Sequence, residues 1–186
     1  MNDFYVPTWD EIEKATLNIA EQAVDSNFIP DVIVAIPTGG VVPSKLLKDV
    51  MNVDRIRYIE IKLYKNVGQK DVKPVVKSVC LDDVEGRDVL VVDDVADSGE
   101  TLETVSNVIA MFSPKSVKYA TVYVKPWARK YPDFYYKLVD KWVIFPWDKW
   151  DVVREKPEVN VDNKDIYLKV EKKMKEITNK NKDLRR

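Results

Sequence analysis

Histidine is absent from the sequence, which has 186 residues. Its absence excludes Ser-His-Asp and Cys-His nucleophile pairs, and it excludes zinc sites with histidine ligands. Acid–base chemistry therefore has to come from Asp, Glu, Lys, Tyr or the single cysteine. A bound metal ion would meet oxygen ligands, which favour Mg²⁺ or Mn²⁺.

The chain also has little cysteine, no long apolar run and no excess of charge. Its one cysteine, Cys80, rules out an intramolecular disulfide bond and is expected to be a buried small residue. No apolar run approaches the ~20 residues of a membrane span, and no basic-then-apolar signal opens the chain, so we expect a cytoplasmic protein with no membrane partner. The net charge of −1 gives no general electrostatic reason to bind nucleic acid.

The stretch from Val89 to Leu102 indicates a buried strand, a loop and the start of a helix. Its aliphatic residues run without interruption into two adjacent carboxylates, Asp93 and Asp94. An Asp-Ser-Gly turn follows and leads into sequence compatible with a helix. Open α/β sheets bind their ligands at strand ends of this kind.

Apolar β-branched runs alternate with amphipathic segments along the chain, which predicts an α/β fold with a parallel sheet and helices on both faces. Thr8 and Glu11 have capping-box spacing at the start of the first expected helix. Expected helices cover residues 9–26, 41–51, 100–112 and 165–178, and expected strands cover residues 31–36, 55–61, 75–81, 89–92, 117–124 and 141–145. We expect four polar clusters to converge at the carboxyl edge of this sheet: residues 37–40, 93–101, 125 and 142–148.

Three segments depart from this pattern. Residues 62–77 are polar, rich in lysine and without a clear period, which is compatible with a solvated hairpin loop or with a lid over the neighbouring site. Residues 127–136 are expected to be irregular. From about Glu155 the apolar residues thin out, so we divide the chain into a main domain, 1–154, and a charged helical extension, 155–186, with a frayed basic tail.

The Asp-Ser-Gly-Glu-Thr segment is suited to hold a phosphate monoester. Gly99 permits close approach of the backbone, Ser98 and Thr101 supply hydroxyl donors, and the first N–H groups of the following helix are unpaired. The segment lacks the Walker lysine and the Gly-x-Gly-x-x-Gly pattern, so it is neither an NTPase loop nor a dinucleotide loop. Asp93 and Asp94 suit the two hydroxyls of a ribose, directly or through Mg²⁺-bound water. The alternative is that one of them merely caps a loop, but this role would not offset the free energy of desolvating two adjacent carboxylates.

A long and specific motif lies here: Val91-Val92-Asp93-Asp94-Val95-Ala96-Asp97-Ser98-Gly99-Glu100-Thr101. It resembles the phosphoribosyl-pyrophosphate (PRPP) motif of type I phosphoribosyltransferases. The resemblance extends over about residues 5–154 and is greatest to the 6-oxopurine enzymes, the hypoxanthine-guanine and xanthine-guanine phosphoribosyltransferases. It implies a parallel-sheet type I phosphoribosyltransferase fold with a small hood, formed by the N-terminus and about residues 126–154, and an extra C-terminal helix.

The resemblance also implies where PRPP and Mg²⁺ would bind. Asp93 and Asp94 would hold the ribose hydroxyls and organise Mg²⁺, Asp148 would approach a second Mg²⁺, and Asp97 would be the acid/base that faces purine N7. The 5′-phosphate would contact Ala96, Asp97, Ser98, Gly99, Glu100 and Thr101. The pyrophosphate would contact the loop Thr38, Gly39 and Gly40, in which the family often has a non-proline cis peptide bond. It would also contact two residues outside this loop, Tyr64 and Arg154.

The base would bind downstream of this motif. Lys125 would donate to the exocyclic O6, Trp142 would stack on the purine, and backbone groups of Val143 and Ile144 would read its edge. The alternatives are that Lys125 is an ordinary lysine at a strand end and that Trp142 is a core aromatic. The other tryptophans are expected to pack or to lie at interfaces: Trp9, Trp127, Trp147 and Trp150.

The sequence departs from the family pattern in several places. Thr38 stands where the family often has Arg or Lys, and Leu63 replaces the serine of a Ser-Tyr pair, although Tyr64 is present. Glu100 lies inside the phosphate loop and would have to point outward. Tyr64 could instead be a surface loop residue, and Arg154 could be a surface arginine in a salt bridge.

The sequence therefore predicts a Mg²⁺-dependent purine phosphoribosyltransferase of purine salvage. PRPP and a 6-oxopurine (hypoxanthine, guanine or xanthine) would give the nucleoside monophosphate and pyrophosphate, and the protein would be a homodimer or homotetramer. One alternative is an adenine phosphoribosyltransferase on the same scaffold. Another is a non-catalytic regulator that binds PRPP or nucleotides and contacts RNA or DNA, but the balanced charge and the retention of Asp93, Asp94 and Asp97 favour an enzyme.

Overall fold

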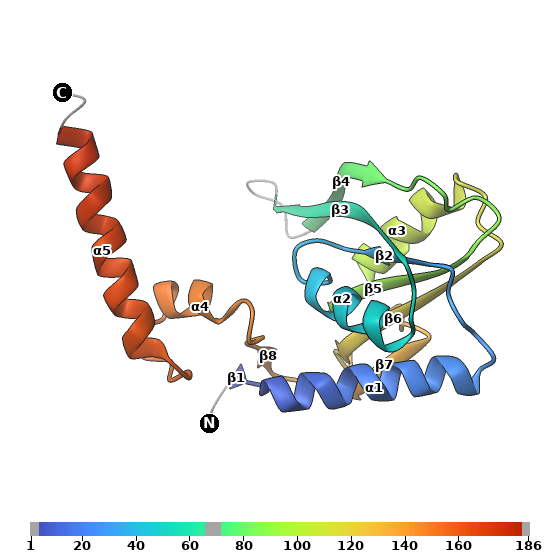
Figure 1. Ribbon diagram of the computed structural model, residues 1–186, viewed down its shortest axis with the longest axis horizontal. Coiled ribbons are helices and arrows are strands. Elements are labelled where there is room, and N and C mark those ends of the chain that lie inside the picture. The colour runs from blue at the N-terminus through green and yellow to red at the C-terminus, as the bar shows by residue number, and fades with distance from the viewer. Residues whose placement is uncertain (1–3, 66–71, 184–186) are drawn as a thin grey trace.

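The structure is a computed structural model that describes residues 4–65 and 72–183 (Figure 1). In this part of the chain, a six-stranded sheet has the order β4-β3-β2-β5-β6-β7, with every pairing parallel except β3–β4. Its strands are β2 (Val32–Ala35), β3 (Arg55–Lys65), β4 (Val72–Cys80), β5 (Asp88–Ala96), β6 (Ser116–Val124) and β7 (Phe134–Leu138). A separate parallel pair joins β1 (Phe4–Tyr5) to β8 (Trp142–Val143). The predicted α/β class is confirmed, with an antiparallel edge strand added.

Helices cover both faces of the sheet, as predicted. They are α1 (Trp9–Asp25), α2 (Val41–Val50), α3 (Glu100–Ala110), α4 (Lys149–Glu155) and α5 (Lys164–Asp183). Side chains alternate along a strand, so Ile33 packs with Ile19 of α1, whereas its neighbour Val34 packs with Leu102 of α3. Helices α1 and α2 therefore lie on one face and α3 on the other (Figure 1).

Strand β5 is the central element that positions the carboxylates. It pairs with β2 on one side and β6 on the other, and Val89, Leu90 and Val91 are fully buried. It continues past its aliphatic run, because Asp93 pairs with Thr121 and the ladder extends to the end of β5. The carboxylates thus lie within a rigid strand and not in the loop after it.

The start of α1 is only partly as predicted. The Thr8 side chain accepts a hydrogen bond from the backbone N–H of Glu11 at 3.2 Å, which is one half of a capping box. The Glu11 side chain is engaged elsewhere, because its Oε1 atom accepts from Tyr5, Tyr123 and Lys137. The predicted second half of the box is therefore replaced by a tertiary network.

Several elements differ from the sequence prediction. The segment 127–136 is not irregular throughout, because its end forms β7. Strand β1 and helix α4 are not among the expected elements. Of residues 62–77, 62–65 belong to β3 and 72–77 to β4, which pair antiparallel; residues 66–71 lie outside the described residues.

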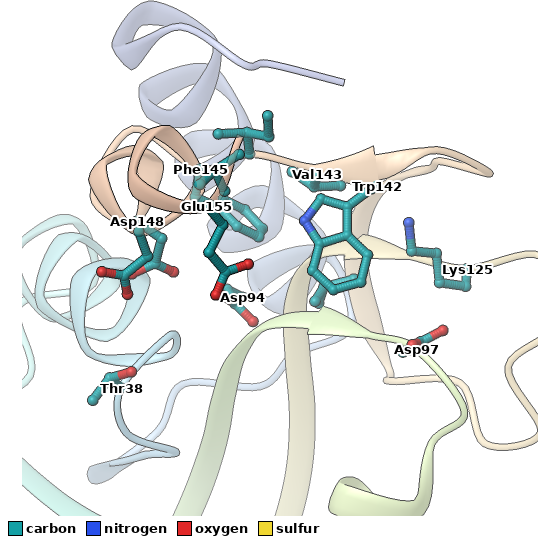
Figure 2. A pocket seen from close by; sticks show the side chains of 13 residues that line it. Thr38, Asp94, Asp97, Lys125, Trp142, Val143, Phe145, Asp148 and Glu155 are labelled. Atoms are coloured by element: carbon teal, nitrogen blue, oxygen red, sulfur yellow. The ribbon is translucent and has the colours of Figure 1, made fainter. Parts of the chain in front are cut away.

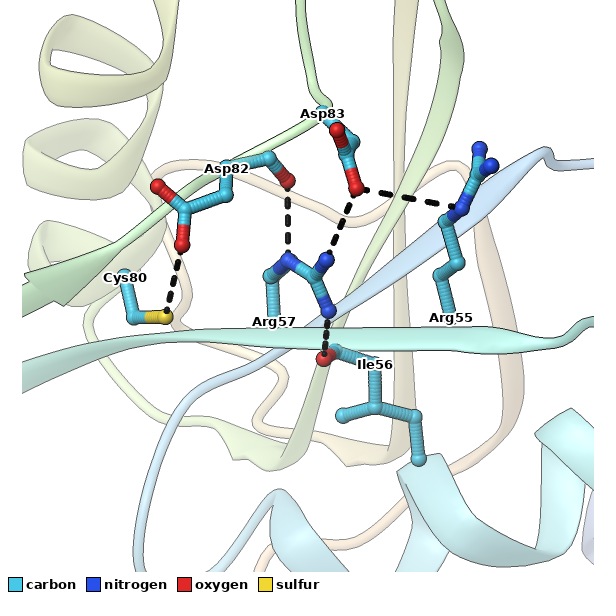
Figure 3. A network of polar contacts seen from close by, with 6 residues as sticks. All are labelled: Arg55, Ile56, Arg57, Cys80, Asp82 and Asp83. Carbon is cyan, nitrogen blue, oxygen red and sulfur yellow. Dashed lines mark hydrogen bonds and ion pairs between the residues drawn. The ribbon is translucent and has the colours of Figure 1, made fainter.

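Cys80 is partly exposed, so its prediction as a buried residue is wrong. It lies in a surface network around the start of β3 (Figure 3). Arg57 donates to the Asp82 carbonyl at 2.8 Å and to Asp83 Oδ2 at 3.0 Å, while Cys80 Sγ lies 3.8 Å from Asp82 Oδ2. These contacts tie the start of β3 to the connection between β4 and β5.

Helix α5 stands away from the sheet at the end of the chain (Figure 1). Its predicted apolar stripe forms but is uncovered, since each member is at least half exposed: Ile166, Val170, Met174 and Ile177. Within the described residues, no helix combines the length and the apolar composition that crossing a membrane requires.

Candidate active site

A cavity of about 400 Å³ opens at the carboxyl ends of β2, β5 and β6, beneath β8 and α4 (Figure 2). Its lining is Thr38, Asp94, Val95, Asp97, Lys125, Trp142, Val143, Ile144, Phe145, Asp148, Asp151, Val152 and Glu155. Each of the four polar clusters that the sequence places at this edge contributes to the lining. The parallel strands bring these clusters together, because their carboxyl ends share one edge of the sheet.

The loop after β2 approaches β5 so closely that a side chain would not fit. A Cβ atom on Gly39 would lie 2.2 Å from Asp94 Oδ2, and one on Gly40 would lie 2.4 Å from a carbonyl oxygen of β5. The peptide bond between Pro37 and Thr38 is cis, as the resemblance implies. The two glycines therefore allow the predicted pyrophosphate loop to lie directly against the predicted ribose carboxylate.

Asp93 and Asp94 lie next to each other near the end of β5. The backbone N–H of Asp94 donates to Asp93 Oδ1 at 2.9 Å. Burial, together with the neighbouring Asp94 carboxylate, raises the pKa of Asp93. Burial also raises the pKa of Asp94 to about 6, with a contribution from the Asp148 carboxylate. Ionisation of these groups therefore costs more in the folded protein than in water, and a bound cation would offset this cost.

The predicted phosphate loop is a tight turn before α3. Gly99 has a φ of +89°, and a Cβ atom there would lie 2.7 Å from the backbone nitrogen of Lys130. The Ser98 hydroxyl accepts from the N–H of Glu100 at 3.3 Å, and the Ser98 carbonyl accepts from the N–H of Arg129 at 2.9 Å. The other residues predicted for the phosphate end β5 or begin α3: Ala96, Glu100 and Thr101. A helix N-terminus at this place leaves N–H groups for an anion.

The base end of the cavity holds a buried lysine and an exposed tryptophan. Lys125 follows β6, is 7% exposed and donates to the carbonyl of Lys141. Burial lowers the pKa of Lys125, although Asp97 and Asp140 act in the opposite direction. Trp142 is 66% exposed and lines the cavity wall (Figure 2), so it is not a core aromatic.

The backbone of β8 and of Ile144 after it has fewer free hydrogen-bonding groups for a base than the sequence predicts. Ile144 is buried, and its N–H donates to the Tyr5 carbonyl at 2.8 Å, so this donor is already used. Val143 is half-buried in the cavity wall. Phe145 belongs to the same wall, and its ring stacks on Trp147 with ring centroids 4.7 Å apart.

The sequence prediction misses one residue that contacts the predicted acid/base and one set that lines the cavity. Trp127 donates from Nε1 to Asp97 Oδ1 at 2.8 Å and so holds the predicted acid/base, although the two residues are far apart in sequence. Asp151, Val152 and Glu155 line the cavity from α4, and Figure 2 shows the Glu155 side chain directed into it. Only a prediction of α4 and its orientation could have identified this set.

Several of the predicted site residues are not part of the cavity lining: Gly39, Gly40, Asp93, Ala96, Ser98, Gly99, Glu100, Thr101 and Arg154. Arg154 donates to the Tyr167 hydroxyl at 2.8 Å and pairs with Asp151, so its guanidinium group is already engaged outside the cavity lining. This position matches the surface alternative for Arg154. Tyr64 lies in β3, and its side chain is outside the described residues.

The carboxylates of the cavity could hold a metal ion only together with other ligands. Among the residues that the structure describes, no three His, Cys, Asp or Glu side chains converge as a site made of protein alone would require. Mg²⁺ is commonly bound by one or two carboxylates plus water and substrate phosphates. Asp94 and Asp148, both with raised pKa values, fit this kind of partial site.

Comparison with known proteins gives a consistent result. The family model described as the phosphoribosyl transferase domain matches residues 8–153. A xanthine-guanine phosphoribosyltransferase of Desulfotalea psychrophila is 33% identical over 146 residues, which cover 77% of this chain and 86% of the relative. One of Idiomarina loihiensis is 31% identical and covers 78% and 87%, respectively. The crystal structure of a purine phosphoribosyltransferase from Pyrococcus horikoshii has a TM-score of 0.70 at 32% identity and covers 78% of this chain and 94% of that one.

Proposed function

The chain belongs to the phosphoribosyl transferase domain family, and we propose that it transfers the 5-phosphoribosyl group from PRPP to a 6-oxopurine in purine salvage. The products would be the nucleoside monophosphate and pyrophosphate. The observation that carries this proposal is the single cavity that joins the PRPP motif to a platform for a base. Asp94 and Asp97 of the motif line this cavity together with Lys125 and Trp142.

Each side chain would have a distinct part in the reaction. The C1′–pyrophosphate bond breaks, the bond from C1′ to the base forms, and Asp97 accepts the proton that leaves N7 of the base. Trp127 holds the Asp97 carboxylate through its indole N–H. Trp142 would hold the base in line by stacking, and the loop at Thr38–Gly40 would hold the departing pyrophosphate.

We propose Mg²⁺ as the cofactor, held by Asp93, Asp94 and Asp148 together with oxygens of PRPP and water. When bound, Mg²⁺ would neutralise charge on the leaving pyrophosphate. Two observations support this assignment. The pKa values of all three carboxylates are raised, and the neighbouring loop at Thr38–Gly40 has no cationic side chain. Thr38 in particular brings no positive charge to that loop.

The preference for a 6-oxopurine rests on Lys125. Its ammonium group is held against the Lys141 carbonyl at the base end and can donate to an exocyclic O6. Adenine has an amino group at this position, which is a poor partner for an ammonium. The names of the curated relatives, xanthine-guanine phosphoribosyltransferases, support the same class of substrate.

The test is a spectrophotometric assay with PRPP, Mg²⁺ and each of guanine, hypoxanthine, xanthine and adenine. We expect turnover of at least one 6-oxopurine and little turnover of adenine. Turnover of adenine alone would overturn the substrate assignment. Binding of PRPP without turnover of any purine would overturn the enzymatic function and favour a regulator.

We also propose that the protein forms a homodimer or homotetramer, and that residues 155–186 are an extension to the main domain. The uncovered stripe of α5 supports an assembly, because exposed apolar patches of this kind commonly mark interaction sites. Residues 164–186 carry nine basic and four acidic side chains, whereas the rest of the chain carries 21 basic and 27 acidic ones, so contact between copies would be favourable. Sedimentation velocity tests this, and a monomer at all concentrations would contradict it. A cytoplasmic location stays a prediction from the sequence.

A further inference from the structure

Three side chains from three different elements meet around the carboxylate of a fourth, Glu11, outside the cavity. Glu11 Oε1 on α1 accepts from the Tyr5 hydroxyl of β1, from the Tyr123 hydroxyl of β6 at 3.1 Å and from Lys137 Nζ of β7 at 2.9 Å. Lys137 Nζ also donates to the Tyr5 hydroxyl and lies 4.5 Å from the centre of the Tyr5 ring. We call Tyr5, Glu11, Tyr123 and Lys137 the anchor cluster.

The anchor cluster is well supported by packing and charge. The rings of Tyr5 and Tyr123 meet edge to face, with centroids 5.5 Å apart and planes at 80°. Buried Ile12 and Phe145 pack in the same apolar cluster. One carboxylate faces one ammonium, and burial opposes the charge on Glu11, but hydrogen bonds from Tyr5 and Lys137 leave its pKa below the usual value. Paired charges of this kind hold a defined geometry.

The anchor cluster leads directly to the base end of the cavity through the backbone of Tyr5. In the described structure, β8 pairs with β1 alone, with Phe4 opposite Trp142 and Tyr5 opposite Val143. The Tyr5 carbonyl also accepts the N–H of Ile144 at 2.8 Å. The backbone of the cavity wall from Trp142 to Ile144 is therefore held by its hydrogen bonds to β1.

Two-residue strands are too short to fix this wall by themselves. An isolated two-stranded pair is marginally stable even at greater length. The side chain of Tyr5 supplies the missing constraint, because Glu11 and Lys137 connect it to α1 and to the central sheet. Residues of the anchor cluster do not line the cavity, so they act on a ligand through neighbouring residues: through β1 and β8, and through Phe145, which packs on Tyr123.

We propose that Tyr5, Glu11 and Lys137 are positioning residues that fix the base platform, Trp142 to Ile144, over the active site. The inference rests on the proposed function, since the ligand of this platform is taken to be the purine. Loss of the anchor should loosen base binding and leave PRPP binding, at the other side of the cavity, almost unchanged. It should also expose the backbone of β8 to solvent exchange in the free protein.

The first experiment measures steady-state kinetics of the variants Glu11→Gln, Tyr5→Phe and Lys137→Met. We expect KM for the base to rise roughly tenfold, the scale of one lost hydrogen bond to a charged group, with KM for PRPP and kcat within about twofold of wild type. Lys137→Arg, which keeps the cation, should restore most of the loss. Asp10→Asn is the matched control, because Asp10 pairs with Lys14 at 2.8 Å on the exposed side of α1.

A double mutant shows whether the anchor acts through the platform. In a Trp142→Ala background, Glu11→Gln should raise KM for the base much less than it does in wild type. Full additivity of the two changes would overturn the inference. Equal increases in KM for base and PRPP would also overturn it, because a general loss of structure has that effect.

Hydrogen exchange without substrate separates this inference from the proposed function. The amide of Ile144 should exchange faster in Glu11→Gln and Tyr5→Phe than in wild type and Asp10→Asn, while the amides of β5 stay protected. Unchanged exchange over residues 142–145 would refute the anchor even if the enzyme turns over 6-oxopurines. Faster exchange in a protein that turns over no purine would retain the structural anchor and refute the function. If Glu11→Gln does not fold, Tyr5→Phe carries the test, because it removes one hydroxyl and keeps the ring.

Discussion

Replacement of Lys125 by methionine is the sharpest test of base choice. Lys125 is 7% exposed, and its ammonium group donates to the carbonyl of Lys141 at the base end of the cavity. Methionine keeps an unbranched apolar stem of similar length and removes only the charged donor. A hydrogen bond to a charged group contributes about 1.5–3 kcal/mol. Since each 1.36 kcal/mol is tenfold in rate, kcat/KM for a 6-oxopurine should fall about 10- to 150-fold.

The same change should affect adenine in a different way. The 6-amino group of adenine gains nothing from an ammonium, so kcat/KM for adenine should stay the same or rise. The assay compares kcat/KM for guanine, hypoxanthine, xanthine and adenine at saturating PRPP. Lys118→Met is the matched control, because Lys118 lies on β6, the strand that Lys125 follows, but pairs with Asp133 at 2.8 Å outside the cavity lining.

An equal loss for all four bases would refute the argument. Lys125 would then support the hood through Lys141 and would not recognise O6. A loss of the same size in Lys118→Met would show that the effect comes from β6 in general. Thermal unfolding of both variants checks that the comparison is made on folded protein.

Other substitutions test the remaining parts of the site. Asp97→Asn should lower kcat by about 10²-fold, the scale of a lost general acid/base, with little change in KM for PRPP; unchanged kcat removes Asp97 from that role. Trp142→Ala should raise KM for the base roughly tenfold, because stacking of a base on an aromatic ring contributes about 1–3 kcal/mol, and Trp142→Phe should retain most of the affinity. Gly39→Ala would place a Cβ atom 2.2 Å from Asp94 Oδ2, so kcat/KM for PRPP should fall on the order of 10²-fold in steady-state assays, and wild-type kinetics would contradict the close approach. Burial raises the pKa of Asp94 from 3.8 to about 6, so the folded protein binds this proton more tightly than the unfolded chain and loses stability as pH rises through that range. Asp94→Asn should therefore raise the melting temperature near pH 8 in EDTA. It should give no gain below about pH 4, where Asp94 becomes protonated in the unfolded chain as well as in the folded protein. An equal gain at both pH values would refute the raised pKa of Asp94 as the cause.

The elements that the sequence predicts well are those with a strong local period. The aliphatic runs of β2 and β5 are buried, and so are most apolar residues of α1 and α3, although Leu17 and Val24 of α1 are exposed. Strands β1 and β8 have two residues each, so they carry no period and form only because tertiary contacts bring them together. Helix α4 is also too short, at seven residues, for an apolar stripe to identify it.

The candidate site shows the same division. The PRPP motif is contiguous, so the carboxylates and phosphate loop could be placed from sequence together with the turn that separates them. Trp127 reaches Asp97 only through the folded sheet. Arg154 lies in α4, which the sequence does not predict, and the structure pairs it with Asp151 and Tyr167. Glu155, the next residue, points into the cavity instead (Figure 2).

The charges of the cavity explain why the reaction would depend on a cation that the protein does not itself supply. Among the described residues of the lining, five are carboxylates and one is a lysine: Asp94, Asp97, Asp148, Asp151, Glu155 and Lys125. PRPP is itself strongly anionic, and Lys125 lies at the base end, away from the loop of Thr38 that would meet the pyrophosphate. Burial of carboxylates costs free energy, and it raises the pKa of Asp94 and of Asp148 in the free protein; the Asp148 carboxylate adds to the shift of Asp94. A divalent cation shared between these carboxylates and the phosphates would remove both costs at once. The same excess of carboxylates that opposes PRPP alone would therefore favour PRPP together with Mg²⁺.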